Sequence, residues 1–160
     1  MARVLIVGCG CRGRALATAL HGDGHAVRGT TRDPSRIGEI EASGVEAAVA
    51  DPDRLATLMP RLDAVAAVCW LMGSATGDTV TALHGPRLRT LMERLVDTPV
   101  RGLVYEAAGS VEGRRLREGA EIVQSAAATW RMPVEVVEHD HDDWRTWVDA
   151  TAAAVARVLA

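Results

Sequence analysis

Short apolar runs alternate with longer amphipathic stretches along the chain. The sequence predicts strands at six places, over residues 3–7, 25–29, 45–50, 63–71, 101–106 and 133–137. Between them, apolar residues recur at intervals of three and four, which is the spacing of one helix face. This alternation is typical of a protein in which each strand is followed by a helix.

The predicted helices have recognisable starts and apolar faces. A first helix follows Gly13, and Asp33-Pro34 and Asp51-Pro52 each offer an N-cap aspartate with a proline at the first helical position. Gly44 closes the helix that Asp33 opens. Three later helices present apolar stripes, formed by Leu88, Leu91, Met92, Leu95 and Val96, by Leu116, Ala120, Val123, Ala127 and Trp130, and by Trp144, Trp147, Val148, Thr151, Val155 and Leu159.

The order of these elements defines a fold class. Residues 63–71 are almost continuously apolar, as expected of a strand that is covered on both faces. Strands that alternate with helices form a parallel sheet with helices on both sides, because the crossovers are right-handed. We therefore expect an α/β protein with a single doubly wound parallel sheet of about six strands in the order 3-2-1-4-5-6, and one domain over residues 1–160.

Composition narrows the range of partners. The net charge is −3, and all 18 basic residues are arginine because the chain contains no lysine. This balance leaves no excess positive charge for a nucleic acid, and no apolar run approaches the ~20 residues that span a bilayer. Neither a nucleic-acid nor a membrane partner is expected. Cys9, Cys11 and Cys69 form no disulfide pattern, which indicates a reducing, cytoplasmic location.

A glycine-rich hexapeptide follows the first predicted strand and opens the first helix. Gly8-Cys9-Gly10-Cys11-Arg12-Gly13 matches G-x-G-x-x-G, the dinucleotide-binding signature of the Rossmann fold. In that loop Gly8 permits the tight turn, Gly10 lets the backbone approach a pyrophosphate, and Gly13 allows close packing of helix on strand. Cys11 and Arg12 are included in the predicted site because the free N–H groups of a helix N-terminus bind phosphate. The alternative is a glycine-rich turn without a ligand.

The end of the second strand favours NADP over NAD. NAD-selective domains place an acidic residue there to bind the ribose 2′-hydroxyl, whereas this chain has Thr31 and Arg32. A guanidinium suits a 2′-phosphate, and Arg12 and Arg36 are candidates for further positive charge. In the alternative, Asp33 binds the ribose and Arg32 is a solvated surface residue. Asp33 is better explained as a helix cap because it precedes Pro34.

These motifs together resemble the NAD(P)-dependent epimerase/dehydratase group, the extended and atypical branches of the short-chain dehydrogenase/reductase superfamily. The resemblance rests on the glycine loop, on Gly29-Thr-Thr-Arg-Asp-Pro34 and on Ala50-Asp-Pro52. It implies that Asp51 contacts the adenine amino group, and that residues 70–73, with Leu71 and Gly73, line the cofactor after the fourth strand.

The chain departs from this family where the family's chemistry lies. The family transfers protons with a Tyr-x-x-x-Lys pair and a nearby serine or threonine, but here the only tyrosine is Tyr105 and there is no lysine. Ala107 and Ala108 stand where the resemblance would place serines after the fifth strand. Tyr105 lies within an apolar strand, so we expect that it is not a general acid. The catalytic residues are therefore unknown from the sequence.

One further cluster invites a metal interpretation. Residues 139–143 read His-Asp-His-Asp-Asp, and imidazole and carboxylate groups are good metal ligands. The run lies between the sixth strand and the last helix, where aspartates are expected as caps, so no metal site is predicted. His139 or His141 remains a candidate general acid or base, and Ser74 and Thr76 are candidates for contact with a nicotinamide or a substrate.

Two functions remain open from the sequence. The first is a small atypical NADP(H)-dependent oxidoreductase, whose unknown small-molecule substrate would lie near Ser74, Glu106, Ala107 and His139. The second is a non-catalytic NADP(H)-binding sensor or subunit, whose site is completed by a partner chain. The substrate side of so short a domain is open, and a homo-oligomer is one way of completing it.

Overall fold

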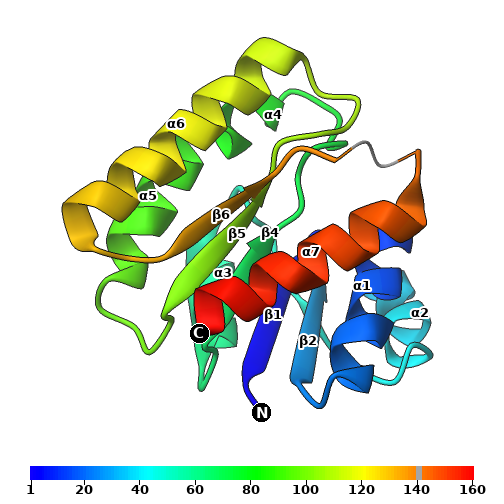
Figure 1. The fold of residues 1–160 in the computed structure, drawn as a ribbon. Helices are drawn as coiled ribbons and strands as arrows, with labels where there is room; N and C mark the ends of the chain where they lie inside the picture. The colour runs from blue at the N-terminus through cyan, green and yellow to red at the C-terminus, as the bar shows by residue number, and fades with distance from the viewer. Residues whose placement is uncertain (140–141) are drawn as a thin grey trace.

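A parallel sheet forms the centre of the molecule in the computed structural model, which describes residues 1–139 and 142–160. Within those residues the sheet has six strands in the order β3-β2-β1-β4-β5-β6 (Figure 1). The predicted fold class and strand order are thus confirmed. The strands are β1 (Arg3–Val7), β2 (Ala26–Thr31), β3 (Glu46–Val49), β4 (Ala67–Trp70), β5 (Gly102–Glu106) and β6 (Val134–Val137).

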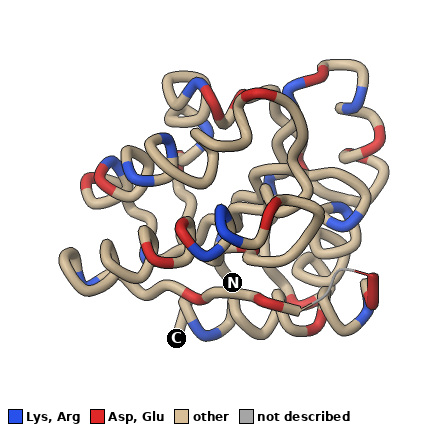
Figure 2. The backbone as a smooth tube through the Cα atoms, turned by 90° about the horizontal axis from the view of Figure 1, so that it is seen from above, with Lys and Arg blue, Asp and Glu red and all other residues tan. Residues whose placement is uncertain are grey.

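Helices cover both faces of this sheet (Figure 1). One face packs against α1 (Cys11–Gly22), α2 (Ile37–Glu41) and α7 (Trp144–Leu159), and the other against α3 (Leu55–Leu58), α4 (Val80–Leu83), α5 (Pro86–Leu95) and α6 (Gly113–Trp130). Two short 3-10 helices, Pro34–Arg36 and Met59–Leu62, precede α2 and follow α3. Acidic and basic positions are intermixed along the chain (Figure 2). None of the helices in the described part is long and apolar enough to cross a membrane.

The central strands are buried on both faces because successive side chains point to opposite sides of a sheet. In β1, Val4 and Ile6 pack into the core under α1 and α7, whereas Leu5 and Val7 pack into the core under α5 and α6. All residues of β4 are fully buried as well. This two-sided burial explains why both strands appear in the sequence as continuous apolar runs.

The caps and stripes of the sequence are confirmed only in part. Asp33 and Asp143 are N-caps, and their carboxylates accept hydrogen bonds from the Ser35 and Thr146 amides. Asp51 is not a helix cap: its carboxylate accepts from the Asp53 amide in a turn, and α3 begins only at Leu55.

Some boundaries and exposures also differ from the prediction. The fourth strand begins at Ala67 rather than 63, because Ala64 adopts a left-handed φ of 58° in a turn. The second strand continues to Thr31, two residues beyond the predicted end. Trp130 is the last residue of α6 and Trp144 the first residue of α7, and they are 48% and 50% exposed. Val96, 41% exposed, lies just past the end of α5.

Candidate dinucleotide-binding site

A cleft of about 460 Å³ opens at the carboxyl ends of β1 to β4. In an open α/β sheet this edge binds ligands where the strand order reverses, which here is between β1 and β4. Seven of the predicted site residues line the cleft, namely Gly8, Gly10, Arg12, Thr31, Arg32, Asp51 and Leu71. Cys11 and Gly13 line a smaller adjacent cavity of about 100 Å³. The loops that carry these residues are far apart in sequence, and the parallel sheet brings them to one edge.

Gly73 is the predicted residue with a different placement. Its amide donates to the Glu106 carboxylate at 2.8 Å, and a Cβ there would collide with the Ala108 carbonyl oxygen. The absence of a side chain therefore serves the packing of the loop after β4 against the loop after β5.

The three loop glycines have different surroundings. Gly8 has a φ of +89°, and a Cβ on it would lie 2.5 Å from the Leu71 carbonyl oxygen. A Cβ on Gly13 would lie 2.9 Å from the Gly8 carbonyl oxygen, so α1 packs tightly on the end of β1. Gly10 has no atom within 4 Å of an added Cβ. Its open face borders the cleft, which leaves room for a ligand to approach the backbone.

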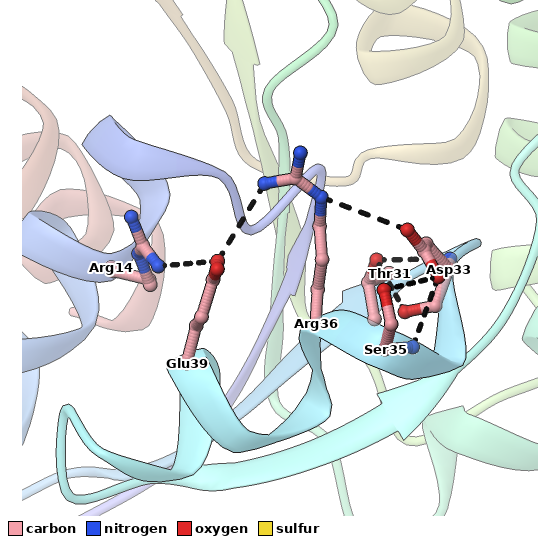
Figure 3. Close-up of polar contacts among 6 residues, drawn as sticks. All are labelled: Arg14, Thr31, Asp33, Ser35, Arg36 and Glu39. Atoms are coloured by element: carbon pink, nitrogen blue, oxygen red, sulfur yellow. Dashed lines mark hydrogen bonds and ion pairs between the residues drawn. The ribbon is translucent and has the colours of Figure 1, made fainter.

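Two arginines at and just after the end of β2, Arg32 and Arg36, differ in their contacts, and Figure 3 shows those of Arg36. Arg36 lies 3.6 Å from the Glu39 carboxylate and 3.9 Å from that of Asp33, and Glu39 also binds Arg14 at 2.7 Å. Arg32 is exposed, and its side chain has no hydrogen bond or ion pair within the described part of the chain. Both arginines border the cleft.

Asp33 is occupied by its own turn (Figure 3). Its carboxylate accepts from the Ser35 amide at 2.9 Å and from the Ser35 hydroxyl at 2.8 Å, and these bonds lower the pKa of Asp33. Asp33 is not among the described residues that line the cleft. The carboxylate that would have favoured NAD therefore stabilises a helix start.

Arg12 points toward the loop after β4. Its Nη2 donates to the Ser74 hydroxyl at 3.0 Å, and its guanidinium carbon lies 5.8 Å from the centre of the Trp147 ring. The Ser74 hydroxyl also accepts from the Ser110 amide at 3.4 Å. One hydroxyl thus connects the loops that follow β1, β4 and β5.

Tyr105 and His84 form a buried pair below this edge. The tyrosine hydroxyl lies 2.5 Å from His84 Nδ1, and His84 Nε2 lies 2.9 Å from the Met72 carbonyl oxygen. Since a carbonyl only accepts, Nε2 carries the proton and Nδ1 accepts from the tyrosine. Burial raises the pKa of Tyr105 and lowers the pKa of His84. Neither side chain reaches the solvent, so the pair is suited to holding α4 against β5.

Sequence reasoning missed Trp147 at the smaller cavity and placed Glu106 only near a substrate. Glu106, at the end of β5, and Trp147, in α7, both line it and are almost fully buried. The position of Glu106 at the carboxyl end of an apolar strand indicated the ligand-binding edge but not this cavity. For Trp147 the helical stripe indicated burial but not the cavity that its ring borders.

The histidine-rich segment lies partly outside the described residues, which omit Asp140 and His141. His139 lines a separate groove between β6 and α7. Among the residues described, no three histidine, cysteine or acidic side chains are grouped so as to hold a metal ion.

No family model matches the sequence, and no curated protein matches it. Solved structures do match the fold. A Bacillus halodurans protein provisionally assigned as an NAD-dependent epimerase/dehydratase is 18% identical, with a TM-score of 0.72 over 88% of this chain and 71% of that one. A short-chain dehydrogenase/reductase superfamily protein from Agrobacterium tumefaciens, with bound NAD, is 21% identical, with a TM-score of 0.68 over 85% of this chain and 48% of that one.

A third match is a triphenylmethane reductase from Citrobacter sp. in complex with NADP(H). It is 15% identical, with a TM-score of 0.66 over 86% of this chain and 49% of that one. The chain thus spans about half the length of the second and third of these proteins. At these identities the likeness shows the fold, a Rossmann domain built as in short-chain dehydrogenase/reductase and epimerase/dehydratase proteins, as the sequence resemblance implied.

Proposed function

We propose that the protein binds NADP(H) in the cleft at the carboxyl edge of the sheet. The observation that carries this proposal is the convergence of the glycine loop, the Thr31-Arg32 segment and the Asp51 turn on one cleft. Gly8, Gly10 and the start of α1 would hold the pyrophosphate. Asp51 would contact the adenine, and Leu71 would line the part of the dinucleotide that passes the end of β4. The fold's likeness to proteins solved with NAD and with NADP(H) supports a nicotinamide dinucleotide.

The preference for NADP over NAD rests on Arg32. Its guanidinium borders the cleft without an ion pair in the described residues, and Asp33 is committed to its turn. A 2′-phosphate would gain charged hydrogen bonds from Arg32, whereas a bare ribose would find no acidic partner at Thr31 or Arg32.

Calorimetric titration with NADPH and NADH tests the proposal directly. NADPH should bind more tightly than NADH, and the difference should shrink as salt is raised, because the 2′-phosphate contact is ionic and partly exposed. Absence of saturable binding by either dinucleotide would refute the assignment of the cleft. Tighter binding of NADH would refute the role of Arg32 while leaving the cleft in place.

We further propose that the protein is a small atypical oxidoreductase that works without a Tyr-x-x-x-Lys pair. The cofactor would supply the hydride, and the protein would orient it. A substrate would lie beyond Ser74, near the ends of β4 and β5. A spectrophotometric screen of carbonyl and enone compounds with NADPH tests this, because turnover oxidises NADPH and lowers the absorbance of the reduced nicotinamide.

One observation favours the alternative, a non-catalytic NADP(H) sensor or a subunit completed by a partner. The hydroxyl of Tyr105 is buried and bound to His84. Tyr105 therefore does not supply, at the cleft, the tyrosine that usually donates the proton in the family. Tight NADPH binding with no turnover in the screen would support the alternative.

A further inference from the structure

The cavity of about 100 Å³ beside the glycine loop is lined by both hydrogen-bond donors and an acceptor. The indole Nε1 of Trp147 and the Nε of Arg12 are buried donors without a hydrogen-bond partner in the described structure. The carboxylate of Glu106, a residue that is 1% exposed, lines the same cavity as an acceptor. Buried donors are nearly always satisfied in folded proteins. The group that fits here therefore accepts from two donors and itself donates to a carboxylate.

The loop after β4 holds the two charged side chains in place. The Gly73 amide donates to Glu106 Oε1 at 2.8 Å, and the hydroxyl of the next residue, Ser74, accepts from Arg12 Nη2 at 3.0 Å. Arg12 forms no ion pair among the described residues, although it lines the same cavity as Glu106. The lining thus carries one positive and one negative group, and it favours neither an anion nor a cation. A neutral polar group avoids the cost of burying a further charge.

A primary amide matches these requirements. Its carbonyl oxygen has two lone pairs, enough for the donors of Trp147 and Arg12, and its nitrogen carries N–H groups that can donate to Glu106. The group is planar and small, and the cavity exceeds the space that a single water needs. An ionised carboxylic acid lacks the N–H and would bring a second negative charge beside Glu106. The lining therefore distinguishes an amide from the corresponding acid.

The cavity lies on the other side of the glycine loop from the proposed 2′-phosphate contact. It shares part of that loop and Leu71 with the large cleft, and it adds Glu106 at the end of β5. Arg32 and Asp51 follow β2 and β3, at the opposite end of the strand order. A dinucleotide with its adenosine at Arg32 and Asp51 and its pyrophosphate at the glycine loop brings its nicotinamide to the β4–β5 side, where this cavity lies.

We propose that Glu106, Trp147 and Arg12 bind a primary amide in this cavity and discriminate against the corresponding acid. The inference rests on the proposed function, because the cavity adjoins the dinucleotide cleft. One source of the amide is the carboxamide of the nicotinamide, and the other is a substrate that carries its own amide. In both cases Glu106 accepts from the amide nitrogen, while Trp147 and Arg12 donate to the carbonyl oxygen.

A deamidated cofactor tests this discrimination. NADP⁺, nicotinic acid adenine dinucleotide phosphate and 2′-phospho-ADP-ribose are titrated calorimetrically into wild type, Glu106→Gln, Trp147→Phe and the control Arg32→Met. The second ligand carries a carboxylate in place of the amide, and the third lacks the nicotinamide. Glutamine keeps an oxygen for the Gly73 amide but replaces the second carboxylate oxygen with a donor. Circular dichroism and thermal melts establish that each variant is folded.

Wild type should bind NADP⁺ about tenfold to a hundredfold more tightly than the deamidated analogue, the range for a lost charged hydrogen bond. Glu106→Gln should largely abolish this preference, because the glutamine N–H can donate to the carboxylate of the analogue. Trp147→Phe should weaken both ligands by about two- to tenfold and keep the preference, because the indole can donate to an oxygen of either. Arg32→Met alone should weaken 2′-phospho-ADP-ribose, since all three ligands carry the 2′-phosphate.

Acetamide separates the two sources of the amide. Its binding to protein saturated with NADP⁺ is followed by saturation-transfer NMR in wild type and Glu106→Gln. Where the nicotinamide fills the cavity, acetamide should not bind to this complex. Where a substrate amide fills it, acetamide should bind to the wild-type complex and not to Glu106→Gln, while NADP⁺ and the deamidated analogue bind alike.

Two results would overturn the inference while leaving the proposed function intact. One is equal binding of NADP⁺ and the deamidated analogue by wild type together with no binding of acetamide, as expected of a cavity that holds only water. The other is a preference for NADP⁺ that is unchanged in folded Glu106→Gln. Failure of wild type to bind any of the three nucleotides would instead refute the proposed function itself.

Discussion

Two arginines near the end of β2, Arg32 and Arg36, differ in whether their side chains form ion pairs. Arg32 has no ion pair in the described structure, whereas Arg36 lies between the carboxylates of Asp33 and Glu39. These ion pairs are exposed and individually weak, but they must be loosened before Arg36 can bind a ligand. Arg32 needs no such rearrangement, so most of the discrimination between NADPH and NADH should come from Arg32.

Replacing Arg32 with alanine should therefore weaken NADPH binding by about 1.5–3 kcal/mol, the range for a charged hydrogen bond. NADH binding should stay nearly unchanged because it has no 2′-phosphate. Arg36→Ala is the matched control and should cost NADPH less. Calorimetry with both dinucleotides measures these differences. Equal losses for NADPH and NADH in Arg32→Ala would show that Arg32 does not bind the 2′-phosphate.

The hydroxyl of Tyr105 stabilises the core through its hydrogen bond with the buried His84. Tyr105→Phe should lower the unfolding free energy by about 1–3 kcal/mol, because it leaves the buried Nδ1 of His84 without a donor. Where hydride transfer is found, turnover should stay within a few-fold of wild type. Urea denaturation and steady-state kinetics measure the two effects. A thousandfold loss of turnover at unchanged NADPH affinity and stability would restore a tyrosine mechanism.

The glycine loop, at the scale of an element, separates folding from binding. Gly10→Val should abolish dinucleotide binding and leave the fold intact, since an added Cβ meets no atom within 4 Å and the φ of −82° suits valine. The branched side chain would occupy the space expected for the pyrophosphate. Gly13→Val is the contrast, because its Cβ would press on the Gly8 carbonyl oxygen and strain the contact of α1 with β1.

Circular dichroism and calorimetry distinguish these two variants. The expected result is a native spectrum without binding for Gly10→Val, and a lowered melting temperature for Gly13→Val. Retained binding by a natively folded Gly10→Val would refute the assignment of the loop to phosphate binding.

The elements could be predicted from the sequence wherever burial is repeated along the chain. β1 and β4 lie between two cores, and their apolar runs follow directly from that burial. The ends of elements were less predictable. The turn at Ala64 uses a left-handed conformation that alanine rarely adopts, and Trp130 and Trp144 continue helical stripes but are half-exposed at the helix ends. A periodic pattern shows which face an element buries but not where its neighbour ends.

The candidate site, like the fold, could be predicted from the sequence only in part. The loops that reach the cleft could be inferred from the order of strands, because carboxyl ends of parallel strands share one edge. The direction of long side chains could not be inferred. Arg12 extends to Ser74, 62 residues later in the chain, and Trp147 borders the small cavity from the opposite end of the sequence. Such contacts depend on packing between distant elements, which no local pattern encodes.

At the scale of the whole molecule, two cores on opposite faces of the sheet meet the cleft at one edge. The core under α5 and α6 contains Tyr105 and borders His84, whose neighbour Leu83 lines the cleft. His84 also binds the carbonyl of Met72, another cleft residue. The buried imidazole of His84 therefore contacts both the core, through Tyr105, and the wall of the cleft, through Met72.

The protonation of His84 should make the stability of the whole fold depend on pH. Burial is the main cause that lowers the pKa of His84 from 6.5, and nearby Arg115 lowers it further, while the bond to Met72 acts in the opposite sense. Below pH 6.5 the unfolded chain takes up a proton at this residue that the folded protein still excludes. The contribution of His84 to stability is thus present above that pH and is lost as the pH falls toward the lowered value.

Urea denaturation at intervals between pH 7.5 and pH 5 measures this loss. The unfolding free energy of wild type should fall across that interval, and His84→Gln, compared with its own value at pH 7.5, should fall less steeply. The interval lies above the range in which Asp33 and Asp143, whose pKa values are lowered by their capping bonds, take up protons. Equal slopes for the two proteins would show that the imidazole is not the group responsible, because glutamine cannot take up the proton that the unfolded histidine binds.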